Sequence, residues 1–240
     1  MSEEIRLNKF LSEAGVCSRR AADAAIEKGQ ITINGKVALM GQKVGPDDVV
    51  CFNGKQVSNV GQKPVLIAYN KPVGIVCTAE KKEKNNIVDH INYPTRIYPV
   101  GRLDKDSHGL ILLTNQGDLV NKMMRAVNHH EKEYVVRVDK EITTDFINKM
   151  SNGIYLDELE VTTRACSVEK LSKYTFRIIL TQGLNRQIRR MCSALGFKVV
   201  DLKRVRIMNI ELADLKEDSY RDVTVEELKV LNKMVEGSKN

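Results

Sequence analysis

The chain has 240 residues, of which 42% are hydrophobic, and this is enough for one sizeable core and a small accessory domain. It contains no apolar run of about 18 residues, and its first residues lack the basic and apolar regions of a signal peptide, so we expect a cytoplasmic protein with no membrane partner. The formal net charge of +7 favours a polyanionic partner, for which nucleic acid is commoner than a membrane surface.

The cysteines and histidines give no pattern typical of a metal site. The five cysteines are odd in number and never spaced as C-x-x-C, which argues against a disulfide framework and against structural zinc. The segment His129-His130-Glu131 is not the zinc motif H-E-x-x-H. We therefore expect no metal, and we expect most cysteines to be small buried apolar residues. They are Cys17, Cys51, Cys77, Cys166 and Cys192.

Residues 5–57 are predicted to form a compact unit that begins with two helices. The first, 7–14, carries apolar side chains at helical spacing. Ser18 is well placed to cap the second, 19–28, and Gly29 to end it.

Two Asn-Gly dipeptides predict hairpins in the rest of this unit. Asn34-Gly35 and Asn53-Gly54 each follow a short β-type run, and Asn-Gly is a strong hairpin signal because both turn positions need positive φ. Short strands are therefore expected at 31–33, 36–38 and 49–52.

Residues 58–64 are polar and turn-rich, and they are the best candidate for a linker to a second domain at 65–240. The second domain alternates β runs with a few helices. Because regular helical crossovers do not separate its strands, the fold class reads as α+β and not as doubly wound α/β. Strands are expected at 65–69, 74–77, 110–113, 134–138 and 176–181, and helices at 118–125, 144–150, 185–195 and after a capping box formed by Thr224 and Glu227.

The second predicted helix begins Ser18-Arg19-Arg20, and two cations on a first turn oppose the helix dipole. A local rule broken in this way hints at function, although an ordinary solvated helix face explains the charges equally well. The order of elements and these residues resemble the S4 RNA-binding domain over residues 5–52. The resemblance implies that Arg19, Arg20 and Lys36 contact RNA phosphates, which position a protein without reading sequence.

The segment Gly101-Arg102-Leu103-Asp104-Lys105-Asp106-Ser107-His108-Gly109-Leu110 places two carboxylates between cations, directly before an apolar strand. A calcium loop also begins Asp-x-Asp, but its twelfth position would be Asn115 in place of a bidentate glutamate, and flanking helices are missing. Two interpretations remain: a turn with local hydrogen bonds, or an active-site loop in which Arg102 and Lys105 bind phosphate while a carboxylate attacks. Composition decides neither between these two nor between Asp104 and Asp106.

Three further segments stand out by their charge or turn chemistry. Lys132-Glu133-Tyr134 opens an alternating strand, where a tyrosine is more often plain core. Residues 182–191 lead through a glycine-containing loop into a helix whose first turn is rich in arginine, and cations at this end favour a bound anion. Lys71-Pro72-Val73-Gly74 reads as a rigid turn. Basic residues that alternate along a later predicted strand extend the candidate RNA surface: Lys203, Arg204 and Arg206.

These segments together resemble the pseudouridine synthases of the RsuA family, enzymes that isomerise uridine in ribosomal RNA. The resemblance covers nearly the whole chain, with four motifs in the family's order. It implies that Asp104 of Gly-Arg-Leu-Asp is the nucleophile and that Tyr134 of Lys-x-Tyr stacks on the flipped target base. It also implies that Arg189, which ends Gly-x-x-x-Gln-Ile-Arg, pairs with Asp104, and a neighbouring cation favours the ionised carboxylate that a nucleophile needs. Asp106 receives no catalytic role.

The resemblance further implies a mixed, largely antiparallel sheet with an RNA cleft along one face, and a reaction that needs no cofactor. Residues 128–134 and 183–187 look most like RluF-type synthases of large-subunit (23S) ribosomal RNA. Arg102 is expected to fill the gap left by the flipped uridine. The residues of this domain expected to contact RNA are Lys71, Arg102, Leu103, Lys105, Arg186, Gln187, Ile188 and Arg190.

Two alternatives stay open. The same chemistry can act on transfer RNA or on small-subunit (16S) ribosomal RNA, because loop shape and the S4-like unit would decide the substrate. A non-catalytic RNA-binding or ribosome-assembly factor with a relic synthase domain is the other alternative, although pure binding has no obvious use for Asp104, Tyr134 and Arg189 together. Nothing in the sequence demands more than a monomer.

Overall fold

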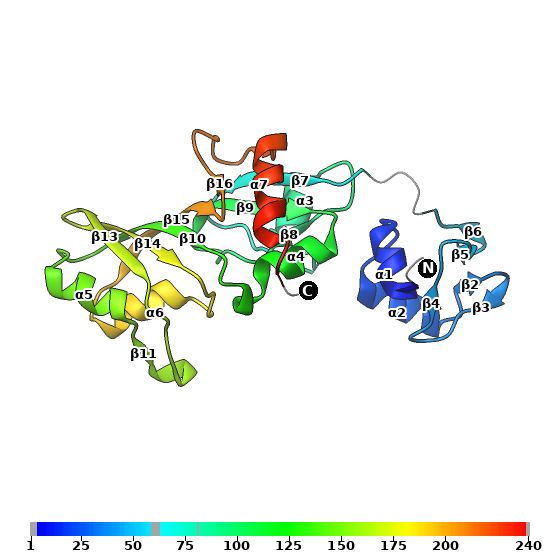
Figure 1. Cartoon of the computed structure of the whole chain (residues 1–240), viewed down its shortest axis with the longest axis horizontal. Helices are drawn as coiled ribbons and strands as arrows, with labels where there is room; N and C mark the ends of the chain where they lie inside the picture. The colour runs from blue at the N-terminus through cyan, green and yellow to red at the C-terminus, as the bar shows by residue number, and fades with distance from the viewer. Residues whose placement is uncertain (1–3, 59–62, 81, 239–240) are drawn as a thin grey trace. The chain divides into compact units, whose positions relative to one another are not determined.

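The structure is a computed structural model that describes residues 4–58, 63–80 and 82–238 (Figure 1). The chain divides into two compact units, and the main division falls between Pro64 and Val65. Of the predicted linker at 58–64, residues 59–62 lie outside the described residues.

The N-terminal unit begins with two helices packed on small sheets. Helix α1 spans Leu7–Glu13 and α2 spans Arg19–Glu27. The Oγ atom of Ser18 accepts a hydrogen bond from the backbone N–H of Ala21 at 3.1 Å, so the predicted N-cap of α2 is confirmed. The apolar faces of both helices meet the inward side chains of the strands in a core of Leu7, Leu11, Ala22, Ala25, Ile26, Ile31, Ile33, Ala38, Val44 and Val50.

Short antiparallel strands complete this unit. A four-stranded sheet has the order β3-β2-β5-β6, and β1 pairs with β4. Asn34 and Asn53 have φ values of 51° and 48°, and the following glycines, Gly35 and Gly54, have 79° and 76°. Both predicted Asn-Gly turns therefore form with the expected positive φ values. The strands are β1 Ile5–Arg6, β2 Ile31–Ile33, β3 Lys36–Val37, β4 Lys43–Val44, β5 Val50–Phe52 and β6 Lys55–Gln56.

A nine-stranded sheet forms the second unit, in the order β13-β14-β10-β15-β9-β7-β17, with β16 beside β15 and β8 beside β9. Among the described strands of this sheet, only the short contact between β15 and β9 is parallel. The predicted α+β fold with a mixed, largely antiparallel sheet is thus confirmed. The strands are β7 Leu66–Lys71, β8 Tyr98–Val100, β9 His108–Thr114, β10 Lys132–Val138, β13 Ser167–Ser172, β14 Thr175–Leu180, β15 Val199–Ile207, β16 Ile210–Glu211 and β17 Tyr220–Asp222.

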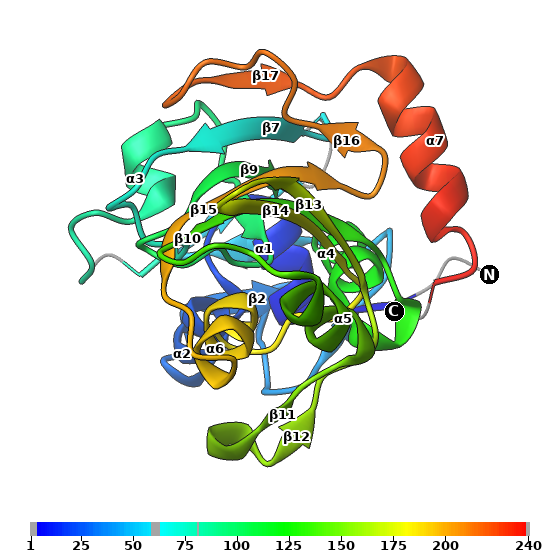
Figure 2. The same ribbon diagram turned by 90° about the vertical axis from the view of Figure 1, so that its left-hand side faces the viewer.

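The central strands of this sheet are buried on both faces. In β9, Ile111 and Leu113 belong to the core that contains α5 and α6, whereas Leu110 and Leu112 belong to the core that contains α4 and α7. Burial on both sides explains the continuous apolar run in this part of the sequence. Figure 2 shows α5 and α6 on the same side of the sheet, with the β11–β12 hairpin projecting beyond them. These elements are α3 Ile87–Ile91, α4 Gly117–Met124, α5 Thr144–Asn152, α6 Gln187–Ala194, α7 Val225–Val235, β11 Tyr155–Leu156, β12 Val161–Thr162 and the 3-10 turns Ala126–Asn128 and Asp157–Leu159.

The predicted strand at 74–77 is wrong. Gly74 has a φ of 95° and donates its backbone N–H to the carbonyl of Lys105, and Val76 forms only an isolated bridge with Asn86. Because the chain turns at Gly74 to cross the 101–107 loop, this segment cannot continue the ladder that β7 begins.

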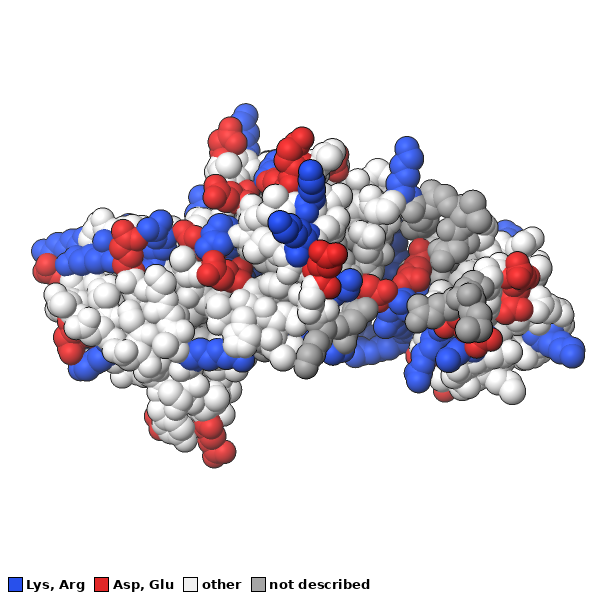
Figure 3. Space-filling view, viewed as in Figure 1, with Lys and Arg blue, Asp and Glu red and all other residues white. Residues whose placement is uncertain are grey.

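Charges on one face of the sheet are arranged in ion pairs. Figure 3 shows Lys and Arg side chains next to Asp and Glu side chains over β13 and β14, whereas the surface over α5 and α6 is mostly uncharged. Arg177 pairs with Glu169 and lies 3.8 Å from Glu133, and Arg206 lies 2.8 Å from Glu133 and 3.0 Å from Glu131. Arg177 and Arg206 are therefore compensated by carboxylates. In residues 4–58, 63–80 and 82–238, no helix is long and apolar enough to cross a membrane.

The capping box predicted at the last helix is present. The Thr224 hydroxyl accepts the backbone N–H of Glu227 at 3.1 Å, and the Glu227 carboxylate accepts the backbone N–H of Thr224 at 2.9 Å. We expect Thr224→Ala to lower the free energy of unfolding by about 1 kcal/mol, because it leaves an N–H of α7 without its acceptor. Urea unfolding measures the change. Thr224→Ser, which keeps the hydroxyl, is the control, and equal stability of the Ala and Ser variants would contradict the assignment.

Candidate active site

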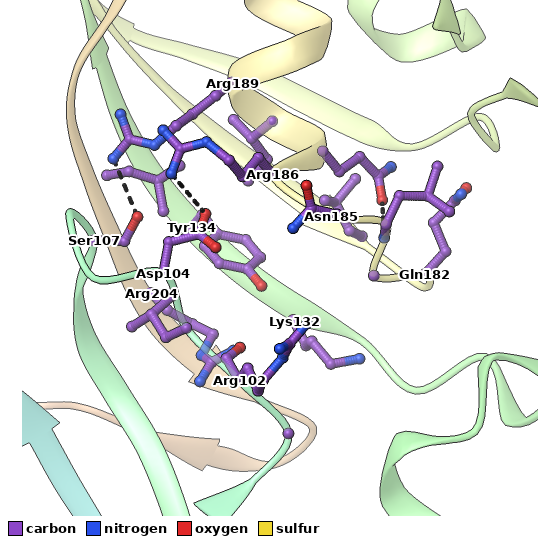
Figure 4. A pocket seen from close by; sticks show the side chains of 18 of the residues that line it. Arg102, Asp104, Ser107, Lys132, Tyr134, Gln182, Asn185, Arg186, Arg189 and Arg204 are labelled. Atoms are coloured by element: carbon purple, nitrogen blue, oxygen red, sulfur yellow. Dashed lines mark hydrogen bonds and ion pairs between the residues drawn. The ribbon is translucent and has the colours of Figure 1, made fainter. Parts of the chain in front are cut away.

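A pocket of about 290 Å³ opens in the second unit where the 101–107 loop, β10, β15 and the start of α6 meet (Figure 4). The three residues that the resemblance marks as catalytic, Asp104, Tyr134 and Arg189, all line it, although 85 positions separate the first from the last. Ligand pockets usually have volumes of roughly 300–1,000 Å³, so this one is near the lower end of the range. It suits a single nucleotide more than a double-stranded RNA helix. The wall contains Leu103, Leu180, Ile188 and Leu202, so the interior is partly apolar.

The side chain of Asp104 is partly exposed to this pocket and has few polar contacts. Its side chain is 34% exposed, and its Oδ2 atom lies 3.9 Å from Nη1 of Arg186. Among the described residues, no hydrogen bond is donated to the Asp104 carboxylate. A carboxylate that faces a pocket can act as a nucleophile, and a cation at ion-pair distance helps to keep it ionised.

Asp106 makes the strong contacts of this loop. Arg186 donates to both carboxylate oxygens of Asp106, at 3.0 and 2.8 Å, and these hydrogen bonds are the main cause of the lowered pKa of Asp106. Arg189 also turns to this region, since its Nη2 donates to the Asp106 carbonyl at 2.8 Å and to the Ser107 hydroxyl at 3.1 Å. The expected direct pair of Arg189 with Asp104 is thus not what the structure has: Arg189 holds the loop backbone, and Arg186 is the arginine beside Asp104 (Figure 4).

The start of α6 explains how two arginines reach one loop. Arg186 is the N-cap of α6 and has a φ of 52°, a left-handed conformation that is uncommon for any residue other than glycine. The Oε1 atom of buried Gln187 accepts the backbone N–H of Leu184 at 3.1 Å and fixes the turn. The first turn of α6 has no acidic residue, so its free N–H groups and Arg186 and Arg189 together favour an anion.

Backbone hydrogen bonds hold the 101–107 loop from beneath. The Lys105 carbonyl accepts from Gly74, the Leu103 N–H donates to Sγ of Cys77 at 3.4 Å, and the Arg102 carbonyl accepts from Nη1 of Arg204 at 3.3 Å. A loop fixed at several points keeps Asp104 in one position, and this preorganisation is what positions a nucleophile for attack.

Lys71 does not belong to the RNA surface that we expected. Its side chain is fully buried, and its Nζ donates to the Pro72 carbonyl at 2.7 Å. Burial lowers the pKa of Lys71, and the charges of Asp104 and Asp106 act in the opposite direction. The expected RNA contact does not agree with this buried position, because the Lys-Pro-x-Gly turn packs against the 101–107 loop through the Gly74 N–H and the Lys105 carbonyl.

Lys132 and Tyr134 lie two residues apart on β10 and therefore face the same side of the sheet. Lys132 is 7% exposed, and burial, with the charge of Arg204, lowers its pKa to about 8. Arg204 lies on the neighbouring strand β15 with its guanidinium carbon 6.0 Å from the centre of the Tyr134 ring. All three side chains line the pocket (Figure 4).

A β-bulge separates Arg204 from Arg206. Arg206 is paired with Glu133, and Arg204 is paired with Tyr134, so Val205 is the extra residue between two successive positions of β10. A bulge re-aims a side chain, and here it turns Arg204 into the pocket while Arg206 stays with the carboxylates of the opposite face. The expectation that Lys203, Arg204 and Arg206 extend one RNA surface is therefore wrong, because Arg204 and Arg206 point to opposite faces of the sheet.

The remaining predicted RNA-contacting residues are distributed as follows. Arg102, Leu103, Gln187 and Ile188 line the pocket, the last three as buried residues. Lys105 is exposed beside it, and Arg190 forms an ion pair with Glu158 in a shallow depression next to the β11–β12 hairpin. In the N-terminal unit, described by itself, the predicted residues Arg19, Arg20 and Lys36 are all exposed.

Several pocket residues were not selected from the sequence. Lys132 was visible through the two-residue spacing that puts it on the face of Tyr134, and Ser107, Gln182 and Asn185 had no comparable signal. In the described part of the chain, no group of three or more His, Cys, Asp and Glu side chains is arranged to hold a metal ion.

Known proteins share this architecture. A family model for RNA pseudouridylate synthase matches residues 65–194, and a model for the S4 domain matches residues 5–50. A structure described as the crystal structure of a pseudouridylate synthase is similar with a TM-score of 0.69 at 29% identity, covering 95% of this chain and 99% of that chain.

Similar sequences agree with these matches. The chain is 53% identical to the dual-specificity RNA pseudouridine synthase RluF of Escherichia coli (strain K12), over 98% of this chain and 80% of that protein. It is 35% identical to the ribosomal large subunit pseudouridine synthase B of Bacillus subtilis (strain 168), over 98% of each chain. It is 34% identical to the ribosomal small subunit pseudouridine synthase A of Pasteurella multocida (strain Pm70), over 95% of this chain and all of that protein. The chain therefore belongs to the RNA pseudouridylate synthase family and carries an S4 domain.

Proposed function

We propose that this chain isomerises a specific uridine of large-subunit ribosomal RNA to pseudouridine, with Asp104 as the nucleophile. The observation that supports this most is the meeting of Asp104, Tyr134 and two arginines in one pocket of nucleotide size. The description of the Bacillus subtilis relative as a ribosomal large subunit pseudouridine synthase favours ribosomal RNA as the substrate class. We propose that it acts in the cytoplasm as a monomer.

Arg102, Tyr134 and Asp104 each have a separate role in the reaction. The exposed cations that we expect to contact RNA gather it, and Arg102, which is exposed at the mouth of the pocket, fills the gap when the uridine leaves the RNA helix. Tyr134 stacks on the uracil ring in place of its former neighbours. The Asp104 carboxylate attacks the ribose or stabilises the ribosyl intermediate while the N1–C1′ bond breaks, and the uracil turns and rejoins through C5. Atoms and electrons balance within the substrate, so the reaction needs no redox partner and no cofactor.

The chemistry provides its own assay. Bond formation at C5 requires C5 to lose its hydrogen, so RNA that carries tritium at C5 of uridine releases tritium to water as pseudouridine forms. We expect the purified chain to release tritium from large-subunit ribosomal RNA up to one equivalent per RNA. Binding of the RNA without release of tritium would favour the binding-only alternative.

A second RNA substrate is the strongest competing possibility, because the relative RluF is described as having dual specificity. Transfer RNA and small-subunit RNA are therefore tested in the same assay. Release from only one of the three RNAs identifies a single-substrate enzyme, and release from two extends the dual specificity to this chain.

We propose that Arg19 and Arg20 of the S4 domain bind RNA phosphates. Both are exposed on the first turn of α2, where the helix dipole adds to their positive charge. We expect replacement of both by alanine to weaken RNA binding and to reduce the slope of log K against log[salt] by about 1.4–1.8, since each lost phosphate contact contributes about 0.7–0.9. Filter binding over a salt series measures this. Lys55→Ala, in an exposed position of β6, is the matched control, and an unchanged slope in the double variant would refute the phosphate role.

A further inference from the structure

The pocket contains more positive charge than its carboxylate can balance. Five cationic side chains line it, Arg102, Lys132, Arg186, Arg189 and Arg204, whereas Asp104 is the one acidic residue among the lining residues. Arg186 and Arg189 are compensated by Asp106 outside the lining. Lys132 and Arg204 have no carboxylate within ion-pair distance among the described residues.

Both of these cations are buried, and their donors are not all used. Arg204 is 1% exposed; its Nε donates to the Leu110 carbonyl at 2.6 Å and its Nη1 to the Arg102 carbonyl, but its buried Nη2 has no partner in the described part of the chain. Lys132 has one long contact, 3.4 Å from its Nζ to the His130 carbonyl. Buried charges are normally paired, because an isolated one loses its hydration without compensation. Two buried cations without carboxylate partners, beside an open pocket, therefore indicate a missing anionic partner.

Another arginine of β15, Arg206, does have carboxylate partners. On the opposite face, Arg206 is held by Glu131 and Glu133, and the bulge at Val205 separates the two arrangements. The absence of such carboxylates around Lys132 and Arg204 is thus a local property of the pocket side.

The walls of the pocket decide which anion fits. A phosphate group is strongly hydrated, whereas Leu103, Leu180 and Leu202 line the pocket with apolar surface and Tyr134 offers a ring face. These features suit a flat heterocycle. When the N1–C1′ bond of uridine breaks, its electron pair stays on N1, and the charge spreads to the carbonyl oxygens O2 and O4.

We propose that Lys132 and Arg204 form an anion-binding floor that stabilises the detached uracil as its negative charge develops. The inference rests on the proposed function and assigns two further catalytic residues to it. As C5 bonds to C1′, C5 loses its proton and N1 takes one up, so the charge on the ring is transient. Donors directed at a transient charge stabilise the transition state and not the bound substrate.

The test replaces the lysine and follows the chemical step alone. With the tritium assay under single-turnover conditions and saturating RNA, we expect Lys132→Met to be slower than the wild type by about 10²–10³-fold, the usual loss when one such donor is removed. RNA affinity and its salt slope should not change. Lys170→Met, in an exposed position of β13, is the matched control and should react at the wild-type rate.

The other possible results of the Lys132→Met experiment either overturn this inference or show that the proposed function itself is wrong. A Lys132→Met rate within about threefold of the wild type would overturn it, and so would a salt slope reduced by about 1 with an intact chemical step, because that result assigns the lysine to a phosphate. If the wild type itself releases no tritium from any RNA, the proposed function fails and not this inference alone.

A charge-preserving variant keeps the test decisive if Lys132→Met does not fold. The groups around Lys132 are Arg204 on β15, Arg102 and Asp104 on the loop, Tyr134 on its own strand, and His130 just before that strand. Since burial lowers the pKa of Lys132 to about 8, its ammonium is lost in the free enzyme as pH rises through that value, and kcat/KM should fall. We expect Lys132→Arg to remain active and to lose this alkaline decline, because arginine stays protonated. Equal alkaline profiles of the two enzymes would overturn the proposal.

Discussion

Replacement of Asp104 by asparagine is expected to lower the rate of pseudouridine formation by at least about 10⁴-fold, because the amide is no nucleophile and carries no charge. RNA binding should stay close to that of the wild type. Asp104 receives no hydrogen bond from the described residues and lies 3.9 Å from a guanidinium nitrogen, so its loss removes little that holds the fold together. Single-turnover tritium release and filter binding with the same RNA measure the two quantities separately.

Asp106→Asn is the informative comparison for this prediction. Asp106, and not Asp104, accepts the two hydrogen bonds of Arg186, so its replacement should displace the arginines and leave the nucleophile in place. We expect a loss of about 10²-fold or less, typical of a positioning residue. If Asp106→Asn were the inactive variant and Asp104→Asn retained activity, the assignment of the two carboxylates would have to be reversed.

The largest expected effect on stability comes from Gly109→Ala. Gly109 has a φ of 100°, and a Cβ atom there would lie 2.3 Å from the backbone oxygen and 2.9 Å from the backbone nitrogen of Arg204. These atoms belong to the parallel contact of β9 with β15, which has only two paired positions. Strained φ and forced overlap together cost about 3 kcal/mol, and the melting temperature should fall by roughly 6–12 °C for a domain of this size.

Gly183→Ala is the matched control for the stability measurement. A Cβ atom at Gly183 would meet nothing within 4 Å, and the backbone there is compatible with alanine. Thermal unfolding of both variants should show a large shift for Gly109→Ala and almost none for Gly183→Ala. Similar melting temperatures for Gly109→Ala and the wild type would mean that β9 and β15 can separate without loss, in contradiction to their close packing.

Local signals in the sequence predicted the elements correctly where the structure is decided locally. The Asn-Gly turns, the Ser18 cap and the capping box of Thr224 each depend on residues within three positions of one another, and all are present. The strand expected at 74–77 was wrong, because the distant Lys105 carbonyl accepts the Gly74 N–H and directs the chain across the loop. No local pattern reports such a contact.

The same limit applies to the active site. The motifs identified the segments that meet in the pocket, but not the partner of each side chain within it. Whether Arg189 or Arg186 lies beside Asp104 depends on the left-handed turn at Arg186, and the direction of Arg204 depends on a one-residue bulge at Val205. Both features change the aim of a side chain without changing the hydrophobic pattern. The burial of Lys71 is likewise a tertiary fact, since a Lys-Pro-x-Gly turn reads as exposed in the sequence.

The central claim, that this chain forms pseudouridine in ribosomal RNA with Asp104, is tested most directly in cells. Pseudouridines are mapped in large-subunit ribosomal RNA from cells that lack the chain, and from the same cells complemented with the wild type or with Asp104→Asn. We expect one site to disappear, to return with the wild type and to stay absent with Asp104→Asn. A map that is unchanged by loss of the chain, or a site restored by Asp104→Asn, would contradict the account.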